Sequence, residues 1–444
     1  MTAPLGDAAA AAAWLESLIV DPPRPYAERA ARAQQAVRAL LAALDGPQRG
    51  LPVIHITGSK GKGSTALLLE ALLRAAGLRV GTFTSPHLEH WRERFRLDGE
   101  PLDEIRFAAL MERVRPPVER LRRDGIGCSF FDTATAAALW LFREEAVDAA
   151  VVEVGLGGRL DATNVVEPRV TCLTGVELEH ADKLGPTLAD IAGHKAGIVK
   201  PGIPLVSGPL PPAAETVVAA AVREQGAPWW RLEHEIRIDW QPGRLRYAAP
   251  GLSLETPLGP AGRHQAINAA LALACAQRFG VESLPRIAAR ALADLQLPGR
   301  GEILSRRPWI VIDGAHTVES ARALRSLLDT LPAGPRHWLL SFTHGKDPRP
   351  FVAELLGSGD RVILTRADPG RSRSPAEIAA LLQEWRPNLH AKTVTEPTAA
   401  LEQALDGLEP DALLCLTGSV YLAGLGRRLL RKNTDARSGP AGRR

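Results

Sequence analysis

Residues 55–65 read His-Ile-Thr-Gly-Ser-Lys-Gly-Lys-Gly-Ser-Thr, and this stretch is the strongest single indication of the fold. The residues before it, 51–56, are apolar and rich in β-branched side chains, which predicts a buried strand. The residues after it, 66–76, are strong helix formers, which predicts a helix. Glycines between a strand and a helix let backbone N–H groups and the positive end of the helix converge on one anion. We therefore predict a phosphate-binding loop.

The spacing of this loop differs from the common pattern G-x-x-x-x-G-K-[ST]. Gly63 separates Lys62 from Ser64, and the earlier glycine is Gly58. An ordinary glycine turn is the alternative interpretation, but such a turn rarely carries two lysines and a Ser-Thr pair. We expect a lysine to contact phosphate and a hydroxyl to be available to Mg²⁺.

Length and composition indicate a globular protein of two or three domains. A chain of 444 residues exceeds one ordinary core, and 45% apolar and 23% charged residues are typical of globular domains. The formal net charge of +4 is concentrated in residues 427–444, which carry a net +6 and leave −2 for the rest. We therefore expect neither a nucleic-acid-binding face nor, since no long apolar stretch occurs, a membrane span.

The four cysteines are Cys128, Cys172, Cys275 and Cys415. They lie far apart in apolar surroundings and without metal-ligand spacing, which predicts buried free thiols in a reducing compartment. The alanine run at residues 8–13 has no basic segment before it and does not resemble a signal peptide. The expected location is the cytoplasm.

Predicted strands and helices alternate along the first half of the chain, which indicates an α/β fold with a parallel sheet. The strand at 79–84 leads into Thr84-Ser85-Pro86-His87, and ligands bind at the carboxyl ends of such strands. The strand at 148–154 has Glu153 near its carboxyl end. A lone buried carboxylate is costly, so we expect it to bind a metal, with a salt bridge under a loop as the alternative.

The second half of the chain begins with a change of character. Residues 228–260 are rich in tryptophan, proline and glycine and predict short antiparallel strands, and Arg263 to Phe279 predicts a helix. Residues 296–301 form a linker, after which strands and helices alternate again. We predict a first domain over 1–297, a smaller Rossmann-like α/β domain over 298–430, and a basic disordered tail over 431–444.

A series of motifs in register resembles the folylpolyglutamate synthases and dihydrofolate synthases, a family of the Mur ligase superfamily. Gly58 to Ser64 is similar to the family's G-T-N-G-K-G-[ST] loop, and Val152 to Asn164 is the longest match. The others, in order, are Thr84–Leu88, Phe131–Ala136, His180 with Leu184-Gly185, Lys195–Ile198, Gly262–Asn268, Pro298–Arg300, Asp313–His316 and Gly345–Asp347.

The resemblance implies a P-loop-containing N-terminal domain and a Rossmann-like C-terminal domain that use ATP to join L-glutamate to dihydropteroate or to the γ-carboxylate of reduced folates. The acceptor carboxylate attacks the γ-phosphate, and the glutamate amine then displaces phosphate from the acyl phosphate. The resemblance further implies two Mg²⁺ ions and a monomer. The alternatives are another Mur-type ligase, such as one acting on peptidoglycan precursors, and a nucleotide-binding regulator without catalysis.

The resemblance also implies the roles of individual residues. Catalytic roles fall on Lys62, His180, Lys195 and His316, and metal binding on Ser64, Glu153, His180 and a carbamylated Lys195. Nucleotide binding falls on Gly58, Ser59, Lys60, Gly61, Lys62, Gly63, Ser64, Thr65, Asn268, Arg300 and Asp313. Acceptor binding falls on Thr84, Ser85, Pro86, His87, Phe131 and Asp161. The alternatives are a solvent-facing Lys195 and a His316 at a helix start that caps a turn.

The sequence departs from the family pattern at four places. Ser59-Lys60 replaces Thr-Asn and adds charge near the phosphates, and Glu179 stands where an aspartate precedes the histidine. His194 replaces a glutamate before Lys195, and Thr317-Val318 replaces Asn-Pro. The last change falls at the expected glutamate or nucleotide pocket and leaves the choice of substrate open.

Overall fold

The computed structural model describes residues 5–19, 26–332 and 334–437. It divides into two compact units. Unit 1 comprises residues 1–259 and 265–295, and unit 2 comprises residues 260–264 and 296–444. This division lies beside the change of domain that the sequence predicts after residue 297.

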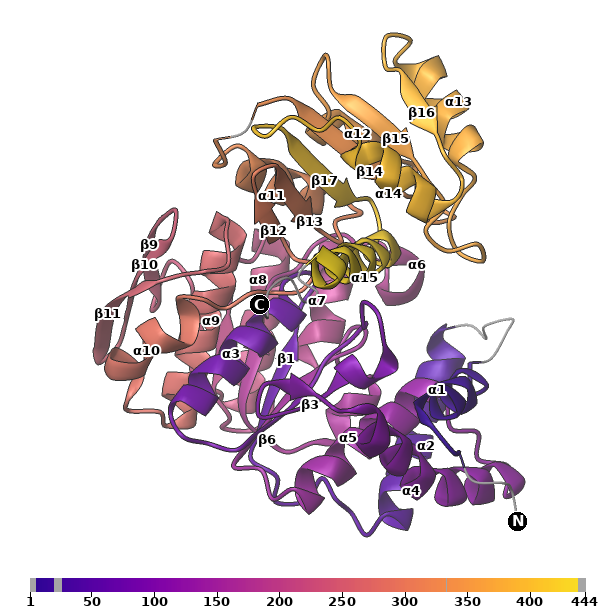
Figure 1. The fold of residues 1–444 in the computed structure, drawn as a ribbon. Helices are drawn as coiled ribbons and strands as arrows, with labels where there is room; N and C mark the ends of the chain where they lie inside the picture. Colours follow the sequence, from indigo (N-terminus) through magenta and orange to yellow (C-terminus); the bar gives the residue numbers. More distant parts are fainter. Residues whose placement is uncertain (1–4, 20–25, 333, 438–444) are drawn as a thin grey trace, which may run out of the picture. The chain divides into compact units, whose positions relative to one another are not determined.

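Unit 1 is built on an eight-stranded sheet in the order β4-β3-β2-β5-β1-β6-β7-β8 (Figure 1). β1 lies between β5 and β6 and is parallel to both. All residues of β1 and β5 are buried, which explains why these strands read as continuous apolar runs. The strands are β1 Val53–Thr57, β2 Val80–Phe83, β3 Phe95–Leu97, β4 Glu100–Pro101, β5 Ala149–Glu153, β6 Pro168–Leu173, β7 Leu205–Ser207 and β8 Trp229–Arg231.

Helices cover both faces of this sheet. α1, α2, α4 and α5 share one apolar core with inward-facing residues of β1, β2 and β5, whereas α3 packs on the other side (Figure 1). The helices are α1 Ala8–Glu16, α2 Tyr26–Ala43, α3 Lys62–Ala75, α4 Glu104–Arg123, α5 Phe130–Glu144, α6 Ala181–Leu184, α7 Leu188–Ala196, α8 Pro212–Gln225, α9 Arg263–Phe279 and α10 Leu284–Leu292, with short 3₁₀ turns η1 Trp91–Arg94 and η2 Ala162–Val165.

The region predicted as short antiparallel strands is only partly so. β9 Arg237–Gln241, β10 Arg244–Ala249 and β11 Leu252–Pro257 form a three-stranded antiparallel sheet, as predicted. β8 instead pairs in parallel with β7 and extends the large sheet. The difference has a topological cause: α8 connects β7 to β8, and a helical crossover returns the chain parallel to the previous strand.

Unit 2 is a second α/β layer structure with a six-stranded sheet in the order β12-β13-β17-β14-β15-β16. Five strands are parallel, and β12 pairs antiparallel with β13 at one edge. Its elements are β12 Glu302–Arg306, β13 Trp309–Ile312, α11 Val318–Leu328, β14 Arg336–Leu340, α12 Arg349–Leu355, β15 Arg361–Leu364, α13 Pro375–Trp385, β16 Ala391–Thr393, α14 Pro397–Leu405, β17 Leu413–Thr417 and α15 Val420–Arg437. The predicted α/β fold class is confirmed in both units.

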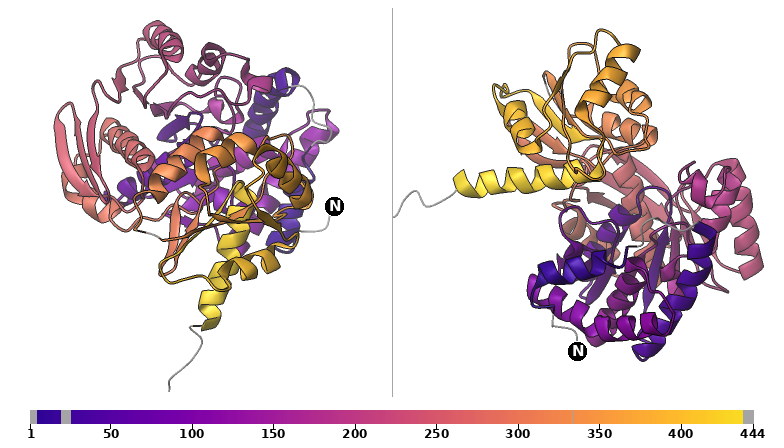
Figure 2. Two further views of the ribbon diagram at one scale, coloured as in Figure 1. Left: turned by 90° about the horizontal axis from the view of Figure 1, so that it is seen from above. Right: turned by 90° about the vertical axis from the view of Figure 1, so that its right-hand side faces the viewer.

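The C-terminal helix α15 runs to Arg437, so residues 431–437, which we predicted to be a disordered tail, are helical. Residues 438–444 of that tail lie outside the described residues. In the right-hand view of Figure 2, α15 extends well beyond the sheet of unit 2. Its base is anchored by Arg427, whose Nε lies 3.0 Å from both carboxylate oxygens of the buried Glu302.

The four cysteines are all buried and free, as predicted. In the part of the chain that the structure describes, no helix combines the length and apolarity that a membrane crossing requires.

Candidate active site

The phosphate loop, residues 58–65, connects the end of β1 to the start of α3. Gly58 and Gly61 both have positive φ, 148° and 83°. A Cβ at Gly58 would lie 1.9 Å from Thr174 Oγ1, and a Cβ at Gly61 would lie 2.3 Å from Asn268 Oδ1. Glycine is therefore required at both positions by backbone conformation and by close packing.

This loop is hydrogen-bonded to the segment that follows β6. Ser59 donates its N–H to Gly175 O at 3.0 Å and accepts from the N–H of Glu177 at 2.9 Å. Thr174 Oγ1 donates to the carbonyl of Lys60. Because β1 and β6 are neighbouring parallel strands, their carboxyl ends meet at one edge of the sheet, where ligands bind in folds of this kind.

Two predicted nucleotide-binding side chains, Lys62 and Asn268, are held against the phosphate loop. The Nζ of Lys62 donates to Gly58 O at 2.8 Å and to Ser59 O at 3.3 Å, so its charge lies across its own loop. Asn268, on α9, accepts from Thr65 Oγ1 at 3.4 Å. Contacts within the protein thus fix the shape of the loop, and Lys62 gives it a positive charge.

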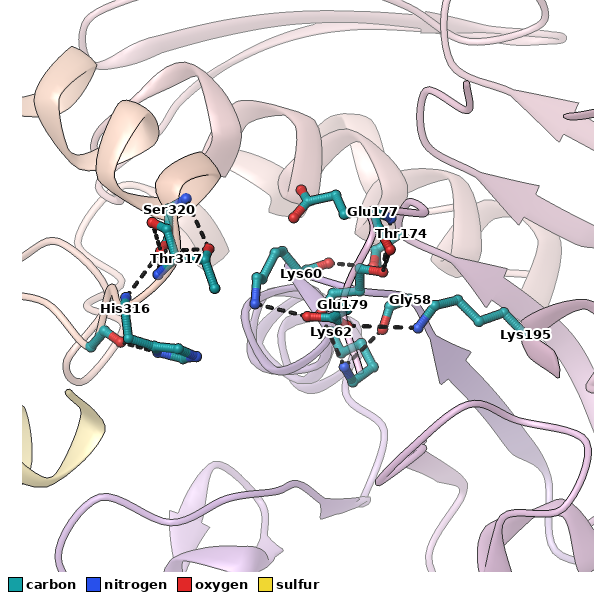
Figure 3. A network of polar contacts seen from close by, with 12 residues as sticks. Gly58, Lys60, Lys62, Thr174, Glu177, Glu179, Lys195, His316, Thr317 and Ser320 are labelled. Atoms are coloured by element: carbon teal, nitrogen blue, oxygen red, sulfur yellow. Dashed lines mark hydrogen bonds and ion pairs between the residues drawn. The ribbon is translucent and has the colours of Figure 1, made fainter. Parts of the chain in front are cut away.

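A lysine–glutamate cluster adjoins the loop. Glu179 Oε2 lies 2.9 Å from Lys60 Nζ, and Glu179 Oε1 lies 3.9 Å from Lys195 Nζ. In Figure 3 the two lysines approach this carboxylate from opposite sides. Lys195 is 1% exposed, so the alternative of a solvent-facing lysine is wrong. Sequence reasoning noted Glu179 only as a departure and gave it no role.

The electrostatics of the cluster favour a neutral Lys195. Burial, followed by the charge of Lys62, lowers the pKa of Lys195 to about 7. Burial opposes ionisation of Glu179, but the charges of Lys60, Lys62 and Lys195 lower its pKa. Burial also lowers the pKa of His180, which begins α6 with a left-handed backbone (φ 51°). At neutral pH a substantial fraction of Lys195 is therefore the neutral amine, beside a His180 ring whose lowered pKa favours the neutral imidazole.

Glu153 ends β5 and is buried beside the phosphate loop's strand. Its Oε2 accepts the N–H of Ser85 at 2.8 Å, so it holds the segment after β2. That segment contains a cis Ser85–Pro86 peptide bond, and His87 Nδ1 accepts from Arg94 Nε at 3.0 Å. The pairing of β2 with β5 brings these predicted acceptor-binding residues to the same edge of the sheet.

Phe131 and Asp161 lie against the loop that follows β5. A Cβ at Gly155 would lie 2.5 Å from Phe131 Cζ, so this glycine lets the ring pack on the backbone. Asp161 Oδ2 accepts the N–H of Leu156 at 2.9 Å, and its Oδ1 accepts from Thr163 Oγ1 at 2.6 Å. The structure therefore holds Phe131 and Asp161 on one loop.

His55, which sequence reasoning passed over, supports Asp161 from below. Its Nε2 lies 2.9 Å from Thr163 Oγ1. Because the Thr163 hydroxyl gives its hydrogen to Asp161, His55 must be the donor, which fixes the hydrogen on Nε2. Burial lowers the pKa of His55 to about 3, consistent with a neutral ring. The signal available in the sequence was a polar residue inside an otherwise apolar strand.

Two of the predicted metal ligands, Ser64 and Glu153, have donor atoms that suit Mg²⁺. Ser64 offers a buried hydroxyl at the start of α3, and Glu153 offers a buried carboxylate, both oxygen donors of the kind Mg²⁺ prefers. The described residues contain no group of three or more His, Cys, Asp or Glu side chains suited to a metal. An ion here would therefore depend on hydroxyl, carbamate or phosphate oxygens in addition to Glu153.

Unit 2 has a pocket of about 470 Å³ at the carboxyl ends of its parallel strands. Its walls are the segments that follow β13, β14, β15 and β17, and they are rich in cationic and imidazole side chains. The lining residues are His316, Thr343, His344, Lys346, Gly370, Arg371, Ser419, Val420 and Tyr421. Arg371 donates to the hydroxyl of Tyr421, and its guanidinium carbon lies 5.2 Å from the centre of that ring. His344, Arg371 and Tyr421 carried no sequence prediction.

The other predicted residues of unit 2 surround the start of α11. Asp313 accepts the N–H groups of Gly301 at 2.6 Å and Ala315 at 2.7 Å, and burial raises its pKa to about 6. Arg300 Nη1 donates to Pro298 O at 3.3 Å. Asp313 therefore fixes the linker that Arg300 belongs to.

Thr317, not His316, caps α11: its side chain accepts from the N–H of Ser320. His316 instead contacts the turn before the helix, which fits the alternative of a helix-start histidine that caps a turn. Its Nδ1 lies 2.8 Å from Gly314 O (Figure 3), and the residue lines the pocket. The substitution of Thr317 for the family's asparagine preserves the helix cap.

A phosphate loop on a parallel sheet, with a cationic pocket on a second α/β unit, defines the class of Mur-type ligases. Residues 299–420 match the family described as "Mur ligase, glutamate ligase domain". The chain belongs to the folylpolyglutamate synthase/dihydrofolate synthase family. It is 35% identical over 412 residues to the folylpolyglutamate synthase of Lacticaseibacillus casei. The matched region covers 88% of this chain and 92% of that protein.

Other relatives agree in fold. A Mycobacterium tuberculosis folylpolyglutamate synthase structure complexed with ADP and AMPPCP is 32% identical, with a TM-score of 0.85 over 95% of this chain and 99% of that one. The structure of Escherichia coli FolC in complex with DHPP and ADP is 28% identical, with a TM-score of 0.85 over 98% and 100%. A probable bifunctional folylpolyglutamate synthase/dihydropteroate synthase of Haloferax volcanii is 33% identical over 404 residues, but this chain spans only 48% of that protein.

Proposed function

We propose that this protein is an ATP-dependent ligase that joins L-glutamate to the carboxylate of dihydropteroate, of a reduced folate, or of both. The observation that carries the proposal is the placement of the phosphate loop, the Lys60–Glu179–Lys195 cluster and the Asp161 loop at one edge of one sheet. Family membership supports the same reaction. We further propose that the protein acts as a monomer in the cytoplasm.

The phosphate loop would bind the phosphates of ATP through its backbone N–H groups and the start of α3. Lys62 needs only to exchange its bonds to Gly58 O and Ser59 O for phosphate oxygens. A positive charge there offsets the repulsion between a carboxylate nucleophile and the polyphosphate and stabilises charge on the transferring group. The acceptor carboxylate would attack the γ-phosphorus, ADP would leave, and an acyl phosphate would result.

The donor set around the loop fits Mg²⁺. Ser64 and Glu153 would hold one ion, and His180 with Lys195 would take part in holding a second. When bound, Mg²⁺ neutralises phosphate charge and orients the phosphoryl group. Because its pKa is about 7, Lys195 holds a substantial neutral fraction at neutral pH. The neutral amine can add CO₂ and release a proton, which converts Lys195 into a carbamate with two oxygen donors.

The acceptor would bind beside Phe131, Asp161 and the segment from Thr84 to His87. Phe131 packs 5.9 Å from the ring of Phe83, which offers a flat apolar surface to an aromatic ring system. Asp161 offers a carboxylate to the N–H groups of a pterin. Its bonds to the N–H of Leu156 and the hydroxyl of Thr163 fix its orientation.

The cationic pocket of unit 2 would bind L-glutamate. Glutamate carries two carboxylates, and His316, Lys346 and Arg371 supply the cationic and hydrogen-bonding partners that such a dianion needs. The chain's match to a glutamate ligase domain over residues 299–420 supports this assignment. Asp313 and Arg300 would take part in binding the nucleotide, and His316 would contribute to the reaction from this unit.

The deciding experiment compares turnover with different acceptors. Purified protein with ATP, Mg²⁺ and L-glutamate is expected to release ADP and phosphate, and to add the mass of one glutamate to dihydropteroate, to tetrahydrofolate or to both. Nucleotide-sugar acceptors are expected to give no product. If only these acceptors reacted, the protein would be a peptidoglycan-type ligase. If ATP bound and no acceptor reacted, it would be a nucleotide-binding regulator.

A further inference from the structure

We propose that a second pocket of unit 1 binds the γ-linked glutamate residues already present on a folate acceptor. The pocket has a volume of about 480 Å³ and lies beside α6 and α7. Its lining residues are Arg159, Lys183, Leu184, Gly185, Pro186, Ala189, Asp190, Gly193 and His194. This inference rests on the proposed function and names a binding site for the part of the acceptor that differs between dihydropteroate and folates.

The cationic side chains of this pocket are available for a ligand. Arg159 is exposed and Lys183 is partly exposed, and neither forms an ion pair or side-chain hydrogen bond among the residues that the structure describes. Both differ from Lys60 and Lys195, which share Glu179. Two cations without acidic partners at one hollow are suited to binding carboxylates.

The one acidic residue of the pocket, Asp190, has a separate role. Its Oδ2 accepts from the Thr187 hydroxyl at 2.6 Å and from the Thr187 N–H at 3.1 Å, which caps the start of α7. Gly185 packs against it so closely that a Cβ there would lie 2.5 Å from Asp190 Cβ. Asp190 is therefore fixed at the helix end, and the pocket keeps a net positive charge because its two cations, Arg159 and Lys183, outnumber this one carboxylate.

The pocket shares its elements with the reacting centre. Arg159 precedes Asp161 by two residues, and its backbone N–H donates to His194 O at 2.8 Å, which joins the acceptor loop to α7. Lys183 follows His180 on α6, and His194 precedes the buried Lys195 on α7. A ligand in this pocket would therefore contact the same loop and the same two helices that hold the acceptor and the proposed metal site.

The chemistry of the acceptors then decides what the pocket can take. Dihydropteroate has a single carboxylate, which is the group that reacts. A folate carries one α-carboxylate for each glutamate besides the terminal γ-carboxylate that reacts. These α-carboxylates are the only additional anions, and Arg159 and Lys183 are cations on the acceptor side without protein partners in the described structure.

The test measures KM for acceptors of increasing glutamate number in Arg159→Ala, Lys183→Ala and the double variant. The KM for tetrahydrofolate and for its γ-linked diglutamate is expected to rise about three- to fivefold in each single variant, and about tenfold or more in the double variant. The KM for dihydropteroate is expected to stay unchanged. Arg159→Lys retains the charge and is expected to restore most of the affinity.

Arg223→Ala is the matched control, because Arg223 is an exposed cation on α8 outside the pocket. The proposal is overturned if KM rises equally for dihydropteroate, if no acceptor responds, or if the wild-type protein uses dihydropteroate and rejects folates that carry glutamate. Failure of the proposed function itself has a different signature, since the wild-type protein would then ligate neither acceptor.

Discussion

The phosphate loop of unit 1 and the cationic pocket of unit 2 are built in opposite ways. The loop is one contiguous stretch whose lysine and glycines have defined partners within hydrogen-bonding or van der Waals distance. The pocket is assembled from the ends of four strands, and His344, Lys346 and Arg371 are exposed on its wall. The loop is suited to a ligand of fixed shape, whereas the pocket is suited to recognise the proposed ligand mainly by charge.

The largest effect is expected from Lys62→Ala. Removing the charge proposed to face the transferring phosphate is expected to lower kcat about a thousandfold, with little change in melting temperature because the hydrogen bonds of Lys62 go only to two carbonyls of its own loop. ADP release in the presence of both substrates measures the effect. Lys60→Ala is the control, because Lys60 is paired with Glu179, and its loss is expected to be much smaller. Turnover within tenfold of wild type would show that Lys62 does not serve the reaction.

Lys195→Met is expected to increase the stability of the protein while it lowers turnover. The pKa of Lys195 is about 7 in the folded protein and about 10.4 when unfolded, so the unfolded state binds the extra proton between these values. Burying Lys195 therefore lowers the free energy of unfolding by its maximal amount below about pH 7, and this destabilisation disappears as pH rises towards about 10.4. Without bicarbonate, the variant is expected to be more stable than wild type by up to about 4 kcal/mol at pH 6.5 and by little at pH 10.

Urea unfolding at the two pH values measures this difference, and turnover of the same variant is expected to fall at least about a hundredfold. If Lys195→Met stabilised the protein equally at both pH values, the lowered pKa of Lys195 would be contradicted. Added bicarbonate is expected to increase the mass of wild-type protein by one carboxylate at Lys195 and to leave the variant unchanged. An unmodified Lys195 in active enzyme would exclude the carbamate.

Variants of the unit 2 pocket are expected to change substrate affinity rather than chemistry. Lys346→Ala and Arg371→Ala should each raise the KM for L-glutamate about tenfold and leave the KM for ATP unchanged, because a charged hydrogen bond to a carboxylate is lost. Arg361→Ala is the control, since Arg361 begins β15 at the opposite end of the sheet. A parallel rise in the KM for ATP would assign the pocket to the nucleotide instead.

The smallest effect is expected from His55, which acts on the acceptor only through Thr163 and Asp161. His55→Leu is expected to raise the KM for the acceptor about fivefold with the KM for ATP unchanged, and His55→Gln to restore it, because the glutamine amide can donate from a similar position. Thr171→Val removes a buried hydroxyl from neighbouring β6 as a control. Equal effects of Leu and Gln at position 55 would reduce its role to packing.

Features that depend on one contiguous stretch, like the phosphate loop, could be predicted from the sequence, whereas features assembled from distant segments could not. The phosphate loop, the alternating strands and helices, and Glu153 at the end of β5 could be predicted, because each depends on residues adjacent in the chain. The family resemblance extended this reach to Lys195 and Asp161 by motif. The position of β8 in the large sheet escaped prediction, since its short tryptophan-rich segment reads equally well as an antiparallel strand.

The sequence by itself determined the two α/β units, the glycine loop and the class of reaction, because strand periodicity, glycine placement and motif order are properties of short segments. Only the tertiary structure decided that Glu179 lies between Lys60 and Lys195, that His55 supports Asp161, and that residues from four strand ends form one pocket. The physical reason is sequence separation: Lys60 and Glu179 are 119 residues apart, and His55 and Thr163 are 108. Such pairs are created by strand order in the sheet, which no local pattern specifies.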